Sequence, residues 1–269
     1  MYAGTTFRVK SGRVMGVHQR VDRLARKKIK HLDIDNTRFP TIERIIHFEG
    51  KNGPDGIKSK SPSIDEPWHF VNPLDKNDRQ LYKDIENHIE NLTQALRSDE
   101  CERAAFEAAW LSHAIVDGLT PPHQYPLSDK IEELWGKPKE SRTTVLDKSF
   151  IKGVNSRDTL SRNWKYWGAG GVWTAHYLFE WGFAAAVSSS RFNEIGIDEA
   201  LKKKVDEIGY LATYESIVNQ VFALEMYEEY YKKGWTRHLA KLSREQLMPL
   251  LINAVGLAWY EADQRASAS

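Results

Sequence analysis

Cysteine is nearly absent from this chain of 269 residues, and this scarcity limits both its covalent and its metal chemistry. Cys101 is the only cysteine. An intramolecular disulfide and a zinc site built on thiolates are therefore both excluded. Any bound metal would have to be held by His, Asp and Glu side chains.

Long apolar runs and a dominant charge are also lacking. No stretch of sequence approaches the roughly 20 apolar residues of a membrane-spanning helix. The 38 Lys and Arg residues nearly balance the 37 Asp and Glu residues, and the net charge of +1 does not point to a polyanionic partner. The first thirty residues are rich in Lys and Arg and have no apolar core segment, so we expect no secretory signal within this chain.

Apolar residues recur at intervals of three and four along most of the chain, and no alternating strand pattern interrupts them. The predicted class is all-α, with a single domain over residues 1–269. Residues 34–75 are rich in Gly and Pro and are expected to form a long ordered loop. The stretch 172–187 is apolar almost all round, which predicts the central buried helix. The other predicted helices span residues 12–31, 77–97, 99–117, 128–135, 197–209, 210–233 and 244–263.

The segment 111–123 carries the most suggestive group of polar residues. His113 and Asp117 are four residues apart, so they share one face of the predicted helix. Asp117 falls in the last turn, where the carbonyl end of a helix disfavours a carboxylate unless a cation is near. Pro121 and Pro122 then form a stiff turn that can bring His123 back towards both. A metal ion would supply the cation, although an isolated pair of this kind is more often a polar helix end.

The spacing His-x3-Asp/Glu occurs four times in the chain, and in two of the four the carboxylate is expected at the surface. His31 and Asp35 follow a basic run, and Asp22, four residues after His18, is expected to pair with a neighbouring Arg on an exposed face. His176 and Glu180 lie in the most apolar segment, where a polar pair needs a partner. Of the other histidines, His47 is expected in the core or at a helix end, and His88 and His238 in solvent.

His18 and His69 complete a candidate set of five histidines and at least three carboxylates. Ligands that offer only nitrogen and oxygen suit zinc, and carboxylates can bridge two ions. Closely spaced zinc ions lower the pKa of a bound water and present positive charge to a phosphoryl oxygen. This pattern therefore predicts a zinc-dependent phosphoester hydrolase.

These residues resemble the zinc-dependent phospholipase C/P1 nuclease family, and most closely its bacterial phospholipase C branch, which includes the alpha-toxin catalytic domain. The family's H-x3-D-x5-H core is similar to the segment His113–His123, and its later H-x3-E to His176–Glu180. Its early helix histidine resembles His18. Its Pro-Asp and His-Phe pairs resemble residues 54–55 and 69–70. Order and most spacings agree over residues 14–183.

The resemblance implies an all-helical fold around a zinc cluster. Asp55, His69, His113 and Asp117 would hold one ion, and His123, His176 and Glu180 a second. His18 and Asp117, with the N-terminal amine and carbonyl, would hold a third. Asp55 would be the general base, with a metal-bridging water as the rival nucleophile. The implied reaction is the hydrolysis of a phospholipid to release its phosphorylated headgroup, which is a role in lipid metabolism.

Two departures from the family pattern leave alternatives open. The family begins with a zinc-binding Trp where this chain has Met1, so two or three zinc ions per chain are expected. The segment between His123 and His176 is unusually long and is expected to form a lid or an extra wall over the cleft. A P1-type nuclease acting on nucleic acid is the alternative enzyme, and a metal-binding protein without turnover is the alternative from another class. No C-terminal lipid-binding domain is expected, so any transient contact with a membrane surface would use this domain, and no protein partner is evident.

Overall fold

The computed structural model describes residues 1, 16–62, 65–124, 126–192 and 196–268. Within these ranges the chain is all-α and has no β-strand, although one isolated bridge joins Val71 and Gln124. The helices are α1 (Val17–Ile29), α2 (Ile42–His47), α3 (Pro54–Lys58), α4 (Gln80–Arg97), α5 (Cys101–Gly118), α6 (Leu127–Trp135), α7 (Val145–Ser149), α8 (Ser156–Trp167), α9 (Val172–Ser188), α10 (Glu199–Ile208), α11 (Tyr210–Phe222), α12 (Met226–Lys233), α13 (Arg237–Leu242) and α14 (Met248–Ser267).

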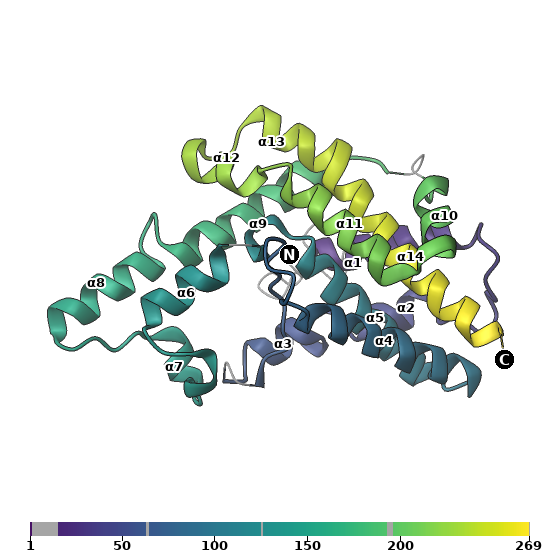
Figure 1. Cartoon of the computed structure of the whole chain (residues 1–269), viewed down its shortest axis with the longest axis horizontal. Coiled ribbons are helices and arrows are strands. Elements are labelled where there is room, and N and C mark those ends of the chain that lie inside the picture. Colours follow the sequence, from purple (N-terminus) through teal and green to yellow (C-terminus); the bar gives the residue numbers. More distant parts are fainter. Residues whose placement is uncertain (2–15, 63–64, 125, 193–195, 269) are drawn as a thin grey trace.

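The centre of the helical body is α14. Every residue from Leu250 to Tyr260 is buried. The helix packs against α1, α4, α5, α10 and α11, which surround it in the body (Figure 1). A helix that is apolar on all sides is stable only when neighbours cover it all round, and α14 meets that condition.

The expectation that residues 172–187 form the central helix is wrong. The predicted helix exists as α9, but it buries one face, and Leu178 on another face is 47% exposed. The rings of Tyr230 and Trp235 lie against Phe179 and cover part of its apolar surface. The composition of α9 reflects this aromatic packing on one side and a cleft on the other, rather than a position at the centre.

The antiparallel pair α4 and α5 carries the polar segment singled out in the sequence. Trp259 of α14 is fully buried and its indole N–H donates to the carbonyl of Ala108, which fixes α5 against the central helix. At the end of α5, a Cβ on Gly118 would lie 2.3 Å from the hydroxyl of Tyr214. A glycine is needed there because another side chain approaches the backbone so closely.

Other predicted helices differ from the observed ones at identifiable points. The expected helix 210–233 is divided into α11 and α12 at Glu225, whose φ of 48° is left-handed. The described part of the expected helix 12–31 is α1, and the residues before 16 lie outside the described ranges. The helix α8 was not predicted, because Tyr166 is its only buried residue and its apolar pattern is weak.

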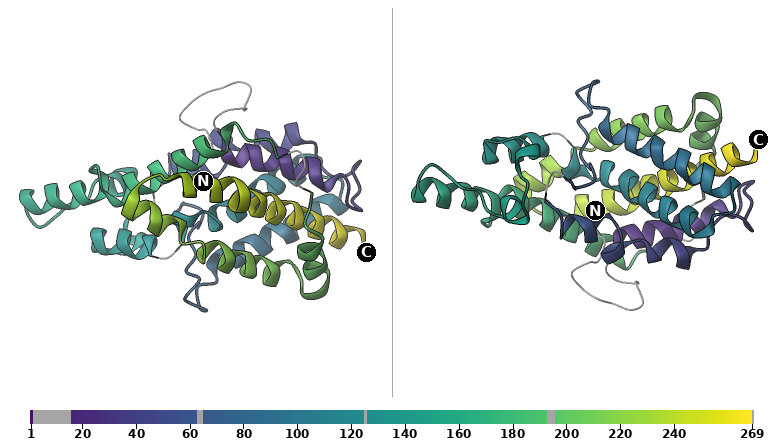
Figure 2. Two further views of the ribbon diagram at one scale, coloured as in Figure 1. Left: turned by 90° about the horizontal axis from the view of Figure 1, so that it is seen from above. Right: turned by 90° about the horizontal axis from the view of Figure 1, so that it is seen from below.

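Residues 127–172 form a small lobe that contains α6, α7 and α8 and projects from the body (Figures 1 and 2). We call this segment the helical lobe. It has its own apolar cluster, made of Leu127, Ile131, Trp135, Ile151, Tyr166 and Val172. The long segment expected to cover the cleft is therefore an ordered part of the fold.

Among the described residues, none of the helices has both the length and the apolar character required to cross a membrane.

Replacement of Trp259 by Ala should lower the free energy of unfolding by about 3–5 kcal/mol, because it empties a fully buried site and removes the bond to Ala108. Urea unfolding followed by circular dichroism measures the change. The matched control is Trp164→Ala, whose side chain is exposed and whose loss should cost about 0.5 kcal/mol or less. Equal losses in the two variants would contradict the central position of α14.

Candidate metal centre

The structure places all eight predicted ligands around one buried region. They come from four helices and two connections that are far apart in the sequence. All of them are buried except Asp55, whose side chain is 23% exposed. His18 lies on α1, Asp55 on α3, His113 and Asp117 on α5, His176 and Glu180 on α9, His69 in the loop before α4, and His123 in the turn after α5.

Asp117 is at the centre of this cluster, at the carbonyl end of α5. Its Oδ1 lies 2.6 Å from the amino group of Met1, and its Oδ2 lies 2.7 Å from Nζ of Lys58. Burial alone would raise the pKa of Asp117, but these two ammonium groups outweigh it and hold the pKa well below its usual range. The cation required at this helix end is therefore supplied twice by the protein itself.

One group of candidate ligands consists of His123, His176 and Glu180. The Nε2 atoms of the two histidines are 2.9 Å apart, and the Oε1 of Glu180 lies 3.2 Å and 2.9 Å from them. Burial and, next, the N-terminal ammonium lower the pKa of His123 to about 4. His123 is therefore neutral at pH 7, which is the form that binds a metal.

A second group consists of His18, His113 and Asp117. Their ligand atoms all lie within 4.8 Å of one another, as those of the first group do. The rings of His18 and His113 are stacked with their centroids 4.0 Å apart. The Nε2 of His18 also lies 2.8 Å from the carbonyl oxygen of Met1, so the amine and the carbonyl of Met1 both face this group. Each of the two buried groups could hold a metal ion.

His69 reaches the cluster because its loop is attached to the turn that carries His123. The backbone N–H of Val71 donates to the carbonyl of His123, and the rings of His69 and His123 are 5.2 Å apart. The Nδ1 of His69 lies 3.0 Å from the carbonyl oxygen of Pro67. Because a carbonyl can only accept a hydrogen bond, Nδ1 carries the proton and Nε2 keeps its lone pair. His69 is thus oriented as a ligand would be.

Lys58 is a component of the cluster that the sequence did not reveal. Its Nζ lies 3.4 Å from the Oδ1 of Asp55 and 3.5 Å from the Nε2 of His113, in addition to its bond with Asp117. Burial would raise the pKa of Asp55, but the charge of Lys58 and then that of His113 outweigh it and lower the pKa. Asp55 is therefore ionised at neutral pH.

Two buried carboxylates near His113, those of Glu49 and Asp22, were not predicted to be buried from the sequence. The Oε2 of Glu49 lies 3.3 Å from the Nδ1 of His113 and orients its ring. Asp22 was expected on an exposed face beside an Arg, and this is wrong: it is fully buried and accepts a hydrogen bond from Ser112. In the sequence, Glu49 lies between an apolar run and Gly50, and this position is the sign that its side chain could be buried.

The remaining histidines lie outside the cluster. His31 is exposed, as expected, and so is His238, which pairs with Glu229. His47 is the last residue of α2 and is exposed, so it is a helix-end histidine. The expectation of solvent for His88 is wrong, because its Nδ1 lies 2.6 Å from Glu107 and the side chain is 21% exposed.

Two hollows adjoin the cluster. The smaller one has a volume of about 320 Å³ and combines aromatic walls with Lys139, Arg142 and Lys148. The larger one, of about 850 Å³, reaches His69, His113 and Asp117 from the side of α4. Rings that line the smaller hollow belong to Trp68, Phe70, Tyr166, Trp167, Trp173 and Tyr177. We call the smaller hollow the cleft.

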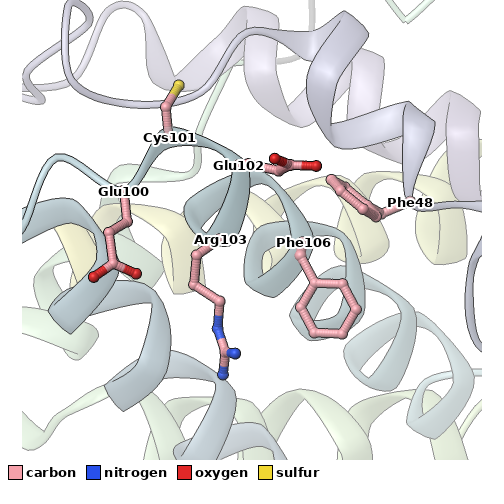
Figure 3. Close-up of a pocket in the computed structure, with 6 residues that line it drawn as sticks. All are labelled: Phe48, Glu100, Cys101, Glu102, Arg103 and Phe106. Carbon is pink, nitrogen blue, oxygen red and sulfur yellow. The ribbon is translucent and has the colours of Figure 1, made fainter.

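A third hollow lies at the opposite end of α5 (Figure 3). It is an open depression of about 580 Å³ where the rings of Phe48 and Phe106 meet edge to face, and the sulfur of Cys101 points away from both. Its lining residues include Glu100 and Glu102 but no histidine, so it lacks the imidazole ligands of the cluster.

Comparison with known proteins returned no match: no family model, no curated protein and no solved structure is similar to this chain.

Replacement of Glu49 by Gln should weaken the binding of a metal ion at His113 by about 10–100-fold, with zinc as the probe ion, because the neutral amide no longer holds His113 as the carboxylate does. Competition with a chromogenic chelator measures the affinity. Glu43→Gln is the matched control, since Glu43 is exposed on α2. If both variants bound zinc as the unmodified chain does, Glu49 would have no part in orienting His113.

Proposed function

We propose that this chain is a zinc-dependent phosphodiester hydrolase of the phospholipase C kind, which releases a phosphorylated headgroup from a phospholipid. The observation that supports this proposal best is the convergence of five histidines and three carboxylates on one buried region that opens into the cleft. Ligand sets without sulfur and with carboxylates that can bridge ions suit hydrolytic zinc sites.

The chemistry of the donor set fits a metal ion. Two imidazole Nε2 atoms and a carboxylate oxygen face one another within 3.2 Å at His123, His176 and Glu180. Electron pairs that point at one another in this way repel unless a cation or a proton lies between them. These three residues would hold one zinc ion, and His18, His113 and Asp117, with the amine and carbonyl of Met1, would hold another. Bound zinc supplies charge stabilisation to the phosphoryl group and lowers the pKa of water.

Lys58 accounts for a difference from the resembled family. Asp55, His69, His113 and Asp117 would surround a further zinc ion there, but the ammonium of Lys58 contacts three of them at 2.7–3.5 Å. We propose that Lys58 replaces that ion, so that the chain binds two zinc ions. Because Lys58 also lines the cleft, its charge is placed to pair with a phosphoryl oxygen of the substrate.

Asp55 is proposed as the general base. It is the most accessible carboxylate of the cluster, and it lines the cleft. A base must be free to take a proton from water, and the other carboxylates are occupied by ligand contacts. The Nζ of Lys58 and the Nε2 of His113 both lie 3.4 Å from its Oδ1 and hold its orientation.

The cleft supports a lipid substrate. Its aromatic walls suit the apolar part of a phospholipid next to the headgroup, while Lys139 and Arg142 suit a phosphate. A P1-type nuclease remains the second candidate, because the indoles of Trp68 and Trp173 in the same walls could stack on bases.

Replacement of Asp55 by Asn should lower hydrolysis by about 10²–10⁴-fold with zinc content unchanged, because the amide cannot take a proton. Zinc-loaded protein is assayed side by side on phosphatidylcholine vesicles, phosphatidylglycerol vesicles and single-stranded DNA. Asp65→Asn is the control, since Asp65 lines only the larger hollow.

Cleavage of lipid that disappears in Asp55→Asn supports the proposal, and cleavage of DNA alone would move the function to the nuclease. No turnover of any substrate by the zinc-loaded chain would favour a metal-binding protein, and full activity in Asp55→Asn would exclude Asp55 as the base.

Replacement of Lys58 by Met should raise the zinc content from two ions per chain to three, because it removes the ammonium from between Asp55, His113 and Asp117. Elemental analysis of protein purified without chelator measures the content. Lys60→Met is the control, since Lys60 is exposed two residues away. Three zinc ions in the unmodified chain would show that Lys58 leaves the site when metal binds.

A further inference from the structure

Charge is distributed very unevenly between the helical lobe and the rest of the molecule. The helical lobe contains nine Lys and Arg and six Asp and Glu, which is a net charge of +3. The positive excess lies in residues 136–168, which contain eight Lys and Arg and only three Asp and Glu, a net charge of +5. The whole chain has a net charge of +1, so the remainder is net acidic. A near-neutral total therefore conceals a basic lobe on an acidic body, and a partner of the lobe is expected to be anionic.

The same lobe carries most of the exposed apolar surface. Within the described ranges, twelve large apolar side chains are exposed, and seven of them lie between residues 145 and 167. Val154 is 90% exposed and Leu160 is 72% exposed. Scattered exposed apolar residues are normal, but a concentration of this kind marks an interaction surface. The seven residues are Val145, Leu146, Phe150, Val154, Leu160, Trp164 and Trp167.

Four of these side chains belong to two segments that lie side by side: Phe150 to the segment 149–153, and the other three to α8. Leu160, Trp164 and Trp167 are spaced by four and three, so they share one face of α8. The segment 149–153 runs along this helix, because Asn163 bonds to both backbone groups of Ile151 and the indole of Trp167 donates to the carbonyl of Ser149. The apolar residues of both segments are thus parts of one structure.

Within residues 136–168 the exposed charges are almost all positive, whereas the exposed acidic side chains Asp129, Glu132 and Glu133 of the lobe lie on α6. Asp147 and Thr144 cap α7 together, and Asp158 pairs with Arg162, so two of the three acidic side chains of this segment are occupied within it. The exposed cations of the segment are Lys137, Lys152, Arg157 and Lys165. Exposed cations beside exposed aromatic and aliphatic side chains form the pattern of proteins that bind to the surface of anionic membranes.

We propose that the helical lobe docks this protein onto the surface of an anionic lipid bilayer. Leu160, Trp164 and Phe150 would enter the boundary between headgroups and acyl chains, and the exposed cations would pair with lipid phosphates. The aliphatic side chains favour lipid over nucleic acid, because bases stack on aromatic rings and gain nothing comparable from Leu or Val. A bilayer surface satisfies both the charge and the apolar area.

The helical lobe borders the cleft, so docking through the lobe would place a bilayer close to the cleft. Trp167 is 43% exposed on α8, and both Trp167 and Ser149 also line the cleft. A bilayer that contacts the lobe would therefore lie beside the mouth of the cleft. The proposal concerns binding and depends on the lobe, so it stands or falls separately from the proposed hydrolysis.

The test is flotation of the zinc-loaded full chain with vesicles of phosphatidylcholine, either pure or mixed with phosphatidylglycerol. We expect binding to the mixed vesicles that weakens as salt increases. The double variant Leu160→Ser/Trp164→Ser should lower this binding at least about tenfold, as expected when two inserted apolar side chains are lost. The matched control is Leu74→Ser/Ile208→Ser, which removes two apolar side chains outside the lobe that are 65% and 54% exposed.

Equal thermal unfolding of the two double variants ensures that folding does not explain a difference in binding. Loss of binding in the lobe variant alone supports docking, whether or not the vesicles are hydrolysed. Equal loss in both variants, no binding of the unmodified chain to mixed vesicles, or capture by single-stranded DNA in preference to vesicles would each overturn the proposal. Hydrolysis of the soluble diester bis(p-nitrophenyl) phosphate, assayed in parallel, tests the catalytic proposal separately.

Discussion

The burial of the Asp117 carboxylate at the carbonyl end of α5 is the constraint on which the rest of the site depends. A negative charge in that place is unfavourable twice, because it is removed from water and because it faces the negative end of a helix. The structure compensates with the ammonium groups of Met1 and Lys58 and with one imidazole near each carboxylate oxygen. Each of these partners is held by a different element, so the charge of one side chain determines where several elements must meet.

The body keeps these partners in place through apolar packing that is remote from the charges. Trp259 fixes α5 to the central helix α14, and Tyr214 presses on Gly118 where α5 ends. The turn after α5 then carries His123 and holds the loop of His69 through the backbone hydrogen bond from Val71 to His123. Rigid support of this kind is what a metal site needs, because ligand geometry must be set before the ion binds.

The body and the helical lobe differ in net charge and in the side chains that they contribute to the site. The body is net acidic and contains all the candidate ligands, while the lobe is basic and contributes cations and aromatic walls to the cleft. A chain with a net charge of +1 can therefore present one face suited to metal ions and another suited to anionic surfaces. Composition averaged over the whole sequence hides this division.

The sequence by itself determined the helical class, the paired residues on α5 and α9, and the exclusion of thiolate chemistry, because helical periodicity and residue type are local properties. Only the tertiary structure decided that α14 is central, that Asp22 is buried and that Lys58 lies between Asp55 and Asp117. Burial depends on which distant helix covers a face, and the reach of a flexible lysine depends on the space left between elements. Neither the burial of a side chain nor the reach of a lysine can be predicted from the spacing of residues along the chain.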